Sequence, residues 1–387
     1  MLTVTQVKLV PTPEVASALS ATLRACNEQA DRISEIVYRT GAKSRKALQG
    51  VAYLELKAAG LSAQPALHVI RKVADAYTTL AANIRAGNLG KKGSKRLRKA
   101  EGKPVSFRPN AAQPFDDRCL SWQLDAQTVS IWTTAGRLKA VPFVCSPDAL
   151  KTLREYRKGE TDLIERDGAF YLIATCDVPE APLKDNPDGF LGVDLGIANI
   201  AITSGGYRAA GRGLNRHRAR MVKLRKKLQA KNTKSSKRVL KRISRKESRR
   251  AKDINHVVSK TIVTTAERTG QGIALEDLTG IRDRVRLRKT QRYKHHSWAF
   301  AQLASFVEYK AKRAGVPLVY VDPAYTSQQC SECGYIDRRN RRTQARFACH
   351  ACGVIMHADH NASHNIARKG HAAWNAGRQS SAPAFAP

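Results

Sequence analysis

Two pairs of cysteines near the end of the chain constrain its fold more than any other feature of the sequence. Cys330 and Cys333 form one Cys-x2-Cys pair, and after fifteen intervening residues Cys349 and Cys352 form a second. This spacing is typical of a four-cysteine zinc ribbon, in which each tight turn presents two thiolates to one tetrahedral ion. Disulfides or chance thiol pairs are the alternative interpretation. The pattern predicts a structural Zn²⁺ site with these four cysteines as its ligands.

The charge of the chain indicates a polyanionic partner. Its 387 residues include 68 Lys and Arg against 32 Asp and Glu, which gives a formal net charge of +36. Basic side chains on phosphates gain affinity from counterion release, so this composition favours nucleic acid. A membrane surface is the competing explanation. However, the sequence shows no run of 18 apolar residues, no lipidation motif and no signal peptide, so we expect a cytoplasmic protein without a membrane partner.

The first half of the sequence predicts a β domain with a helical insertion. Strand-like patterns at 3–10 and about 105–178 predict an antiparallel β domain over residues 1–10 and 105–186, either a small barrel or a sheet, and the prolines at 179–187 predict a linker. Residues 11–104 contain three stretches with helical spacing and form the predicted helical unit. This unit ends in a basic, glycine-containing loop at 87–104, which we expect to become ordered on nucleic acid.

From residue 187 onward, short apolar strands alternate with helices. The alternation predicts an α/β core over 187–328 and 353–370, interrupted by the zinc ribbon at 329–352. Residues 211–250, expected as two antiparallel helices, carry eighteen Lys and Arg against one acid. That imbalance favours phosphate contacts over the alternative of a solvated charged surface. Residues 371–387 are rich in small residues and proline and are predicted to form a disordered tail.

Three acidic residues carry the chemistry predicted for the core. Asp194 and Glu276 each follow a short apolar strand, and Asp359 begins a helix. Sites in open α/β sheets form where strands end, and carboxylates that converge there need cations between them. A turn carboxylate and a helix cap are the alternative interpretations of the first and third acids, and Asp277 competes with Glu276. Together the acids predict a site for two Mg²⁺ ions, with Mn²⁺ as a substitute, that hydrolyses phosphodiesters.

The segments around the acids and cysteines resemble a known family. They are residues 8–13, 192–196, 274–278, 325–334, 349–353 and 359–366. In these segments the chain resembles TnpB, the RNA-guided nuclease family of IS200/IS605-group insertion sequences, which is related to type V CRISPR effectors. The resemblance spans roughly residues 3–370 and is most specific in the last third of the chain. The chain departs from the family at His357 and Ala358, where the family more often has Asp and Arg.

The resemblance implies a multidomain α/β fold. Its parts would be a RuvC-like (RNase H-like) nuclease core with the inserted zinc ribbon, a β-barrel wedge domain and a small helical recognition unit. It implies that Asp194, Glu276 and Asp359 are the catalytic acids and the Mg²⁺ ligands, which favours Glu276 over Asp277. It also implies a guide RNA derived from the transposon end, a double-stranded DNA target and a bacterial or archaeal cell.

The sequence therefore predicts a Mg²⁺-dependent, RNA-guided DNA endonuclease encoded by a transposable element. The first alternative is a nuclease-inactive, RNA-guided DNA-binding repressor on the same scaffold, and loss of an acid would be its sign. The second is an unguided zinc-ribbon DNA-binding protein, against which the strand-end acids argue. A transposase that joins strands is a further alternative, and the resemblance favours cleavage instead. The guide, the motif beside the target and the oligomeric state stay open.

Overall fold

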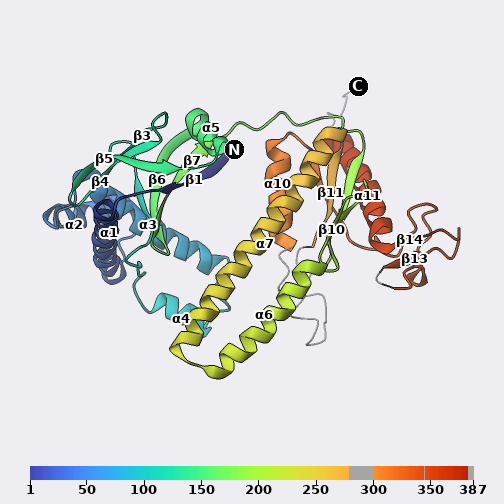
Figure 1. Ribbon diagram of the computed structural model, residues 1–387, viewed down its shortest axis with the longest axis horizontal. Coiled ribbons are helices and arrows are strands. Elements are labelled where there is room, and N and C mark those ends of the chain that lie inside the picture. Colours follow the sequence, from blue (N-terminus) through green and yellow to red (C-terminus); the bar gives the residue numbers. More distant parts are fainter. Residues whose placement is uncertain (279–299, 344, 382–387) are drawn as a thin grey trace. The chain divides into compact units, whose positions relative to one another are not determined.

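The computed structural model describes residues 1–278, 300–343 and 345–381 (Figure 1). The chain divides into two compact units, Met1–Val178 and Pro179–Pro387. Among the described residues, no helix combines the length and the apolar character that crossing a bilayer requires.

The first unit is built on a seven-stranded antiparallel sheet with the order β2-β6-β7-β1-β5-β4-β3. The strands are β1 (Leu2–Leu9), β2 (Gln113–Phe115), β3 (Leu120–Gln123), β4 (Thr128–Thr133), β5 (Gly136–Val144), β6 (Arg157–Arg166) and β7 (Ala169–Asp177). Strand β1 pairs with both β7 and β5, so the start of the chain lies in the middle of a sheet formed mainly by residues after 112. The helical segment is therefore an insertion between β1 and β2.

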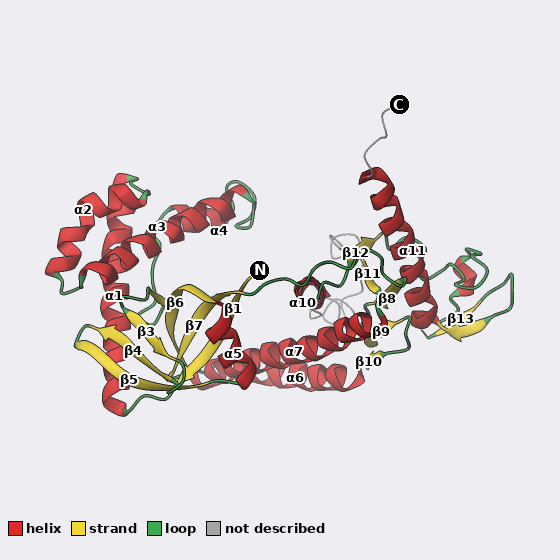
Figure 2. Cartoon of the chain, turned by 90° about the horizontal axis from the view of Figure 1, so that it is seen from above, coloured by secondary structure: helices red, strands yellow, loops and turns green. Residues whose placement is uncertain are grey.

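The sheet curls into a nearly closed, barrel-like form around one apolar core (Figure 2). Its two edge strands, β2 and β3, contribute Phe115 and Leu120 to the same buried cluster, and only four residues separate these two in the chain. Helix α5 (Pro147–Tyr156) adds the buried Leu153 to this cluster. Because both edges meet one core, the structure favours the barrel over the open sheet.

Three long helices form most of the insertion, namely α1 (Pro13–Thr40), α2 (Arg45–Ala58) and α3 (Ala63–Arg85). Thr12 begins α1, because its hydroxyl accepts a hydrogen bond from the Val15 N–H and Pro13 fixes φ in the first turn. The helices pack on each other through their own cluster of buried apolar residues. The prediction of a loop at 87–104 is wrong in part. Helix α4 (Lys95–Glu101) forms there because Ser94 caps a run of good helix formers and Leu97 is buried.

The second unit contains a five-stranded mixed sheet with the order β10-β9-β8-β11-β12. The strands are β8 (Phe190–Asp194), β9 (Asn199–Thr203), β10 (Arg208–Ala210), β11 (Gly272–Glu276) and β12 (Leu318–Val321). Strands β8, β11 and β12 run parallel, whereas β9 and β10 each run antiparallel to their neighbours. Parallel strands end at the same edge of a sheet, so this topology fixes where the strand-end acids emerge.

Helices cover both faces of this sheet. Helix α7 (Lys234–Thr269) and α10 (Phe300–Arg313) share one buried cluster with side chains of β8 and β11, and α11 (Ala358–Ser381) packs on the opposite face. Helix α6 (Arg212–Lys231) runs beside α7, as both views show (Figures 1 and 2). The two helices are joined at Asn232, whose φ of 45° is left-handed. The predicted basic hairpin is therefore confirmed as two helices.

Two predicted boundaries need correction. Residues 179–186, predicted as a linker at the end of the β domain, belong to the second unit, because their backbone bonds within it. The Ala181 N–H donates to the Arg313 carbonyl at 3.2 Å, and the Lys184 N–H donates to the Gly315 carbonyl at 2.9 Å. The prediction of a disordered tail at 371–387 is wrong for residues 371–381, which continue α11.

The helical extension has a physical reason. Alanine-rich segments favour a helix as readily as a loop, so small residues alone do not predict disorder. Trp374 then anchors the last turns, since its ring lies 6.0 Å from the ring of the buried Phe190. Residues 382–387 lie outside the described residues.

Candidate functional site

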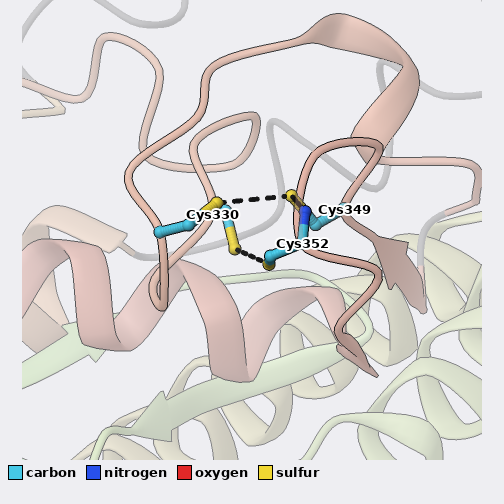
Figure 3. Close-up of side chains that lie close together, drawn as sticks. Cys330, Cys349 and Cys352 are labelled. Atoms are coloured by element: carbon cyan, nitrogen blue, oxygen red, sulfur yellow. Dashed lines mark hydrogen bonds between the residues drawn. The ribbon is translucent and has the colours of Figure 1, made fainter.

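The four cysteines of the sequence motif come together at one point. Their sulfur atoms all lie within 4.8 Å of one another, with 3.7 Å between Cys330 and Cys352 and 3.6 Å between Cys333 and Cys349. Figure 3 shows Cys330, Cys349 and Cys352 turned toward one another. A tetrahedral ion with metal–sulfur bonds of about 2.3 Å separates its sulfurs by about 3.8 Å. All four are free thiols, so the cluster fits a metal ion and not the alternative of disulfides.

Local backbone geometry builds this cluster. Gly334 and Gly353, which follow the two cysteine pairs, have φ of 78° and 73°, and their N–H groups close tight turns. Strands β13 (Arg346–Ala348) and β14 (Ile355–His357) flank the second turn. Burial raises the pKa of Cys349, but hydrogen bonds from the N–H groups of Cys352 and Ala351 outweigh it and lower this pKa to about 7. The turn therefore favours the thiolate, the form that binds metals.

Two of the predicted acids leave the same edge of the second sheet. Strands β8 and β11 are adjacent and parallel, and their register pairs Val193 with Leu275. Asp194 and Glu276 are the next residues on each strand. Their carboxylates therefore emerge side by side, at the strand ends where the sequence predicts a site.

The third acid reaches this edge because α11 packs very closely on β8. A Cβ added to Gly192 would lie 1.9 Å from the Ser363 carbonyl oxygen, so only glycine fits at this contact. The first turn of α11 carries Asp359, which is 6% exposed. The glycine two residues before Asp194 thus lets the helix carry Asp359 toward the other two acids.

The electrostatics show that the acids influence one another. Burial raises the pKa of Asp194 to about 7, with further contributions from the charges of Glu276 and Asp359. Burial also raises the pKa of Glu276. Among the described residues, only the four thiols group three or more ligand atoms within 4.8 Å, so the acids are spaced more widely than the thiols. Buried carboxylates that repel one another favour the binding of a cation between them.

Three polar residues that sequence reasoning missed hold these acids. The Thr326 hydroxyl donates to Oε1 of Glu276 at 2.6 Å, and Nδ2 of Asn199 donates to Oδ2 of Asp359 at 2.9 Å. Arg341 forms an ion pair with Oδ1 of Asp359 at 3.3 Å. Thr326 belongs to a segment that carries the family resemblance, which could have drawn attention to it. Arg341 is one of several arginines between the cysteine pairs, and no sequence signal distinguishes it.

Two buried asparagines join the cysteine segment to α11. Nδ2 of Asn361 donates to the Gln329 carbonyl at 2.7 Å, and its Oδ1 accepts from the Ser331 N–H at 2.8 Å. Nδ2 of Asn365 donates to the carbonyls of Thr326 and Gln329 at 2.9 and 2.7 Å. The first cysteine pair, Thr326 and the helix of the third acid therefore share one support.

Arg341→Gln is expected to destabilise the protein in the absence of Mg²⁺ and to increase its stabilisation by added Mg²⁺. The arginine neutralises Asp359 and also lowers the pKa of Asp194, so its loss leaves the carboxylates without this compensating charge. We expect the free energy of unfolding to fall by about 1–3 kcal/mol without metal. Thermal unfolding with and without Mg²⁺ measures both effects. Arg339→Gln is the matched control, because that arginine pairs with Asp337 on the exposed side of the same segment. Equal responses of the two variants would contradict the prediction.

Two models of known protein families match the segments of the chain that carry this site. A family model described as "Probable transposase" (OrfB_IS605) matches residues 174–279, and a "Cas12f1-like, TNB domain" model matches residues 300–366. The first contains Asp194 and Glu276, and the second contains the four cysteines and Asp359.

Curated relatives agree with these matches. A CRISPR-associated endodeoxyribonuclease Cas12f1 of Sulfoacidibacillus thermotolerans is 47% identical over 114 residues, which are 29% of this chain and 26% of the relative. A protein of the same name from Syntrophomonas palmitatica is 32% identical over 54% of this chain and 45% of its own length. The TnpB-like protein MJ0751 of Methanocaldococcus jannaschii is 34% identical over 38% and 52%. The chain thus spans about half the length of these relatives or less.

A solved structure shares the fold. It is the cryo-EM structure of a Cas12f1–sgRNA–target DNA complex, and it covers 90% of this chain and 82% of its own, with a TM-score of 0.56 and 17% identity. The fold is therefore that of the Cas12 effector proteins. Together with the family matches, this confirms the resemblance predicted from the sequence: the chain is similar to TnpB-like and Cas12f-like proteins.

Proposed function

We propose that the protein is an RNA-guided DNA endonuclease that hydrolyses its target at Asp194, Glu276 and Asp359 with two Mg²⁺ ions. The observation that carries the proposal is the meeting of these acids at one sheet edge, where burial and mutual repulsion raise the pKa of Asp194 to about 7. Bound cations relieve such repulsion, and the carboxylate oxygens are ligands that Mg²⁺ prefers. The relatives named as endodeoxyribonucleases support this activity.

The mixed sheet supports a RuvC-like (RNase H-like) nuclease core. Three parallel strands carry the acids or flank them, two antiparallel strands extend one side, and helices cover both faces. The nuclease core would include residues 187–328 and 353–370, with the ribbon at 329–352. In the first unit, the barrel-like sheet would form the wedge domain and residues 11–104 the recognition unit.

The chain's own residues would prepare the acids for this chemistry. Two bound Mg²⁺ ions would activate the attacking water and neutralise the leaving oxygen. Thr326 fixes one oxygen of Glu276, and Asn199 fixes one oxygen of Asp359, so the acids are oriented before substrate arrives. Arg341 holds the second oxygen of Asp359. Arg341 would have to release this oxygen for a Mg²⁺ ion to bind to it.

Zn²⁺ is the metal we assign to the cysteine cluster, with a structural role. Four thiolates complete a tetrahedral shell and leave no open position for substrate or water. The Sγ–Sγ distances of 3.6 and 3.7 Å fit this shell.

The α6–α7 hairpin would contact the phosphates of guide RNA and target DNA. Its single acid between residues 211 and 250, Glu247, forms an ion pair with Arg225, so the acid is neutralised within the hairpin. Over residues 211–250, eighteen Lys and Arg thus face this single acid, so the hairpin keeps a large excess of positive charge. Such contacts bind the backbone, whereas base pairing with the guide would read the sequence.

Sequencing the RNA that copurifies with the protein tests the guide. The expected result is one defined transcript from the end of the transposable element, followed by Mg²⁺-dependent cleavage of double-stranded DNA that matches it. Absence of a defined RNA would overturn the guide hypothesis. Binding of matched DNA without cleavage would favour the repressor.

Glu276→Gln and Asp277→Asn separate the two adjacent acids. Glu276 is held by Thr326 near Asp194, whereas Asp277 is exposed on the other side of the strand end. We expect Glu276→Gln to lower the cleavage rate by about a thousandfold, since a lost metal ligand costs several kcal/mol of transition-state stabilisation. Asp277→Asn should cleave nearly as well as the parent. The opposite ranking would assign the metal to Asp277.

A further inference from the structure

Two histidines on α11 form a pair that neither the cysteine cluster nor the acidic site uses. His360 and His364 are four residues apart, so they lie one turn apart on the same face of the helix. Their Nε2 atoms face each other at 3.3 Å, and their ring centroids are 4.5 Å apart at an interplanar angle of 77°. Both side chains are half-buried.

The distance between the two nitrogens fits a shared metal ion. Zn²⁺ binds imidazole nitrogen at about 2.0–2.1 Å, so two such ligands at a tetrahedral angle are about 3.3–3.4 Å apart. An N–H···N hydrogen bond between the rings also accounts for this distance, and the number of bound zinc ions distinguishes the two explanations. Imidazole pairs favour Zn²⁺, Cu²⁺ and Ni²⁺ over Mg²⁺.

A carboxylate from the cysteine segment is the candidate third ligand for this pair. Glu332, between the cysteines of the first pair, is exposed and acts electrostatically on His364. Its oxygens do not group with both imidazole nitrogens within 4.8 Å, so this exposed side chain would have to rotate toward the pair to bind the same ion. Arg368 also acts on His364, but its guanidinium donates to the Ser331 carbonyl and so ties α11 to the same turn.

We propose that His360 and His364, together with Glu332, form a second transition-metal site that takes Zn²⁺ and joins the first turns of α11 to the cysteine segment. The site is separate from the cysteine cluster, whose four sulfurs complete a shell of their own. It is also separate from the acids, because Asp359 bonds to Asn199 and Arg341, and successive helical residues point about 100° apart. The metal would stabilise the start of α11 and take no part in hydrolysis.

The number of bound Zn²⁺ ions tests this site. The full chain is dialysed against micromolar Zn²⁺ with excess Mg²⁺, which keeps Zn²⁺ from the acidic site, and the bound zinc is measured by elemental analysis. We expect a second equivalent of zinc in the parent protein and its loss in His364→Gln, while the first equivalent stays. The retained first equivalent shows that the variant is folded around the cysteines.

Three comparisons make the result decisive. His371→Gln, on the same helix but outside the pair, should keep both equivalents. Glu332→Gln should weaken the second site about tenfold, and added Zn²⁺ should raise the melting temperature of the parent but not of His364→Gln. A single equivalent in the parent, a second equivalent retained by His364→Gln, or unchanged affinity in Glu332→Gln would overturn the proposal.

Discussion

Asp194→Asn is expected to abolish DNA cleavage and, at the same time, to stabilise the protein in the absence of Mg²⁺. Its carboxylate is buried beside Glu276 and Asp359, and these surroundings raise its pKa from 3.8 to about 7. An asparagine keeps the shape of the side chain but carries no charge, so it removes both the repulsion and a metal ligand. We expect cleavage to fall by about a thousandfold or more, because the ligand contributes several kcal/mol in the transition state.

The sign of the stability change follows from proton binding. Between pH 3.8 and about 7 the folded state holds a proton on Asp194 that the unfolded state releases. The free energy of unfolding of the parent therefore falls as pH rises through this window and stays low above it. The advantage of Asp194→Asn should grow from pH 4 to 7 and reach at most about 4 kcal/mol.

Thermal unfolding at pH 5 and pH 8, without Mg²⁺ but with the zinc retained, measures this effect. Asp194→Asn should show the larger gain at pH 8, and added Mg²⁺ should raise the melting temperature of the parent more than that of the variant. Asp277→Asn, which changes an exposed acid next to the site, should show no comparable gain. Cleavage at the parental rate would show that Asp194 is not a metal ligand. Equal stability at pH 8 would show that burial and repulsion do not raise the pKa of Asp194.

The parts of the site that depend on local sequence were predictable. A Cys-x2-Cys turn brings two sulfurs together within a few residues, so the cysteine motif needs no knowledge of distant contacts. The positions of the acids depend on distant contacts as well, because Asp194 and Glu276 come together only when β8 pairs with β11, a strand far along the chain. Strand ends indicated where such residues would lie, and the family resemblance selected Glu276 over its neighbour.

The contacts that orient the acids were not predictable in the same way. Thr326 and Asn199 reach the carboxylates from a loop and a strand that only tertiary packing brings there. The close approach of α11 to Gly192 likewise follows from the packed sheet. Composition also gave a wrong prediction at the end of the chain. Residues 371–381, predicted to be disordered, are helical, and the ring of Trp374 packs near that of Phe190.

Cys349→Ser is expected to release the zinc, unfold the cysteine segment and impair cleavage without touching the acids. A serine hydroxyl does not replace a thiolate, and about 10–16 kcal/mol of metal binding commonly supports the folding of such small sites. The segment has few apolar contacts besides the metal, since among the described residues its buried cluster consists of Cys330, Phe347, Cys349 and Ala358, with Val354 and Met356 partly buried against it. Elemental analysis should show the loss of zinc, and limited proteolysis should cut between the two cysteine pairs.

The loss of cleavage should be indirect, because the segment supports the acids through hydrogen bonds. Without the folded turn, Asn361 loses its partners at Gln329 and Ser331, and Arg341 loses its fixed position beside Asp359. We expect cleavage to fall by at least about tenfold, a change of 1.4 kcal/mol. Cys145→Ser, which alters a thiol of the first unit outside the cluster, should retain both zinc and activity. Full zinc in Cys349→Ser would refute the assignment of the ligand, whereas full activity after zinc loss would separate the ribbon from the nuclease site.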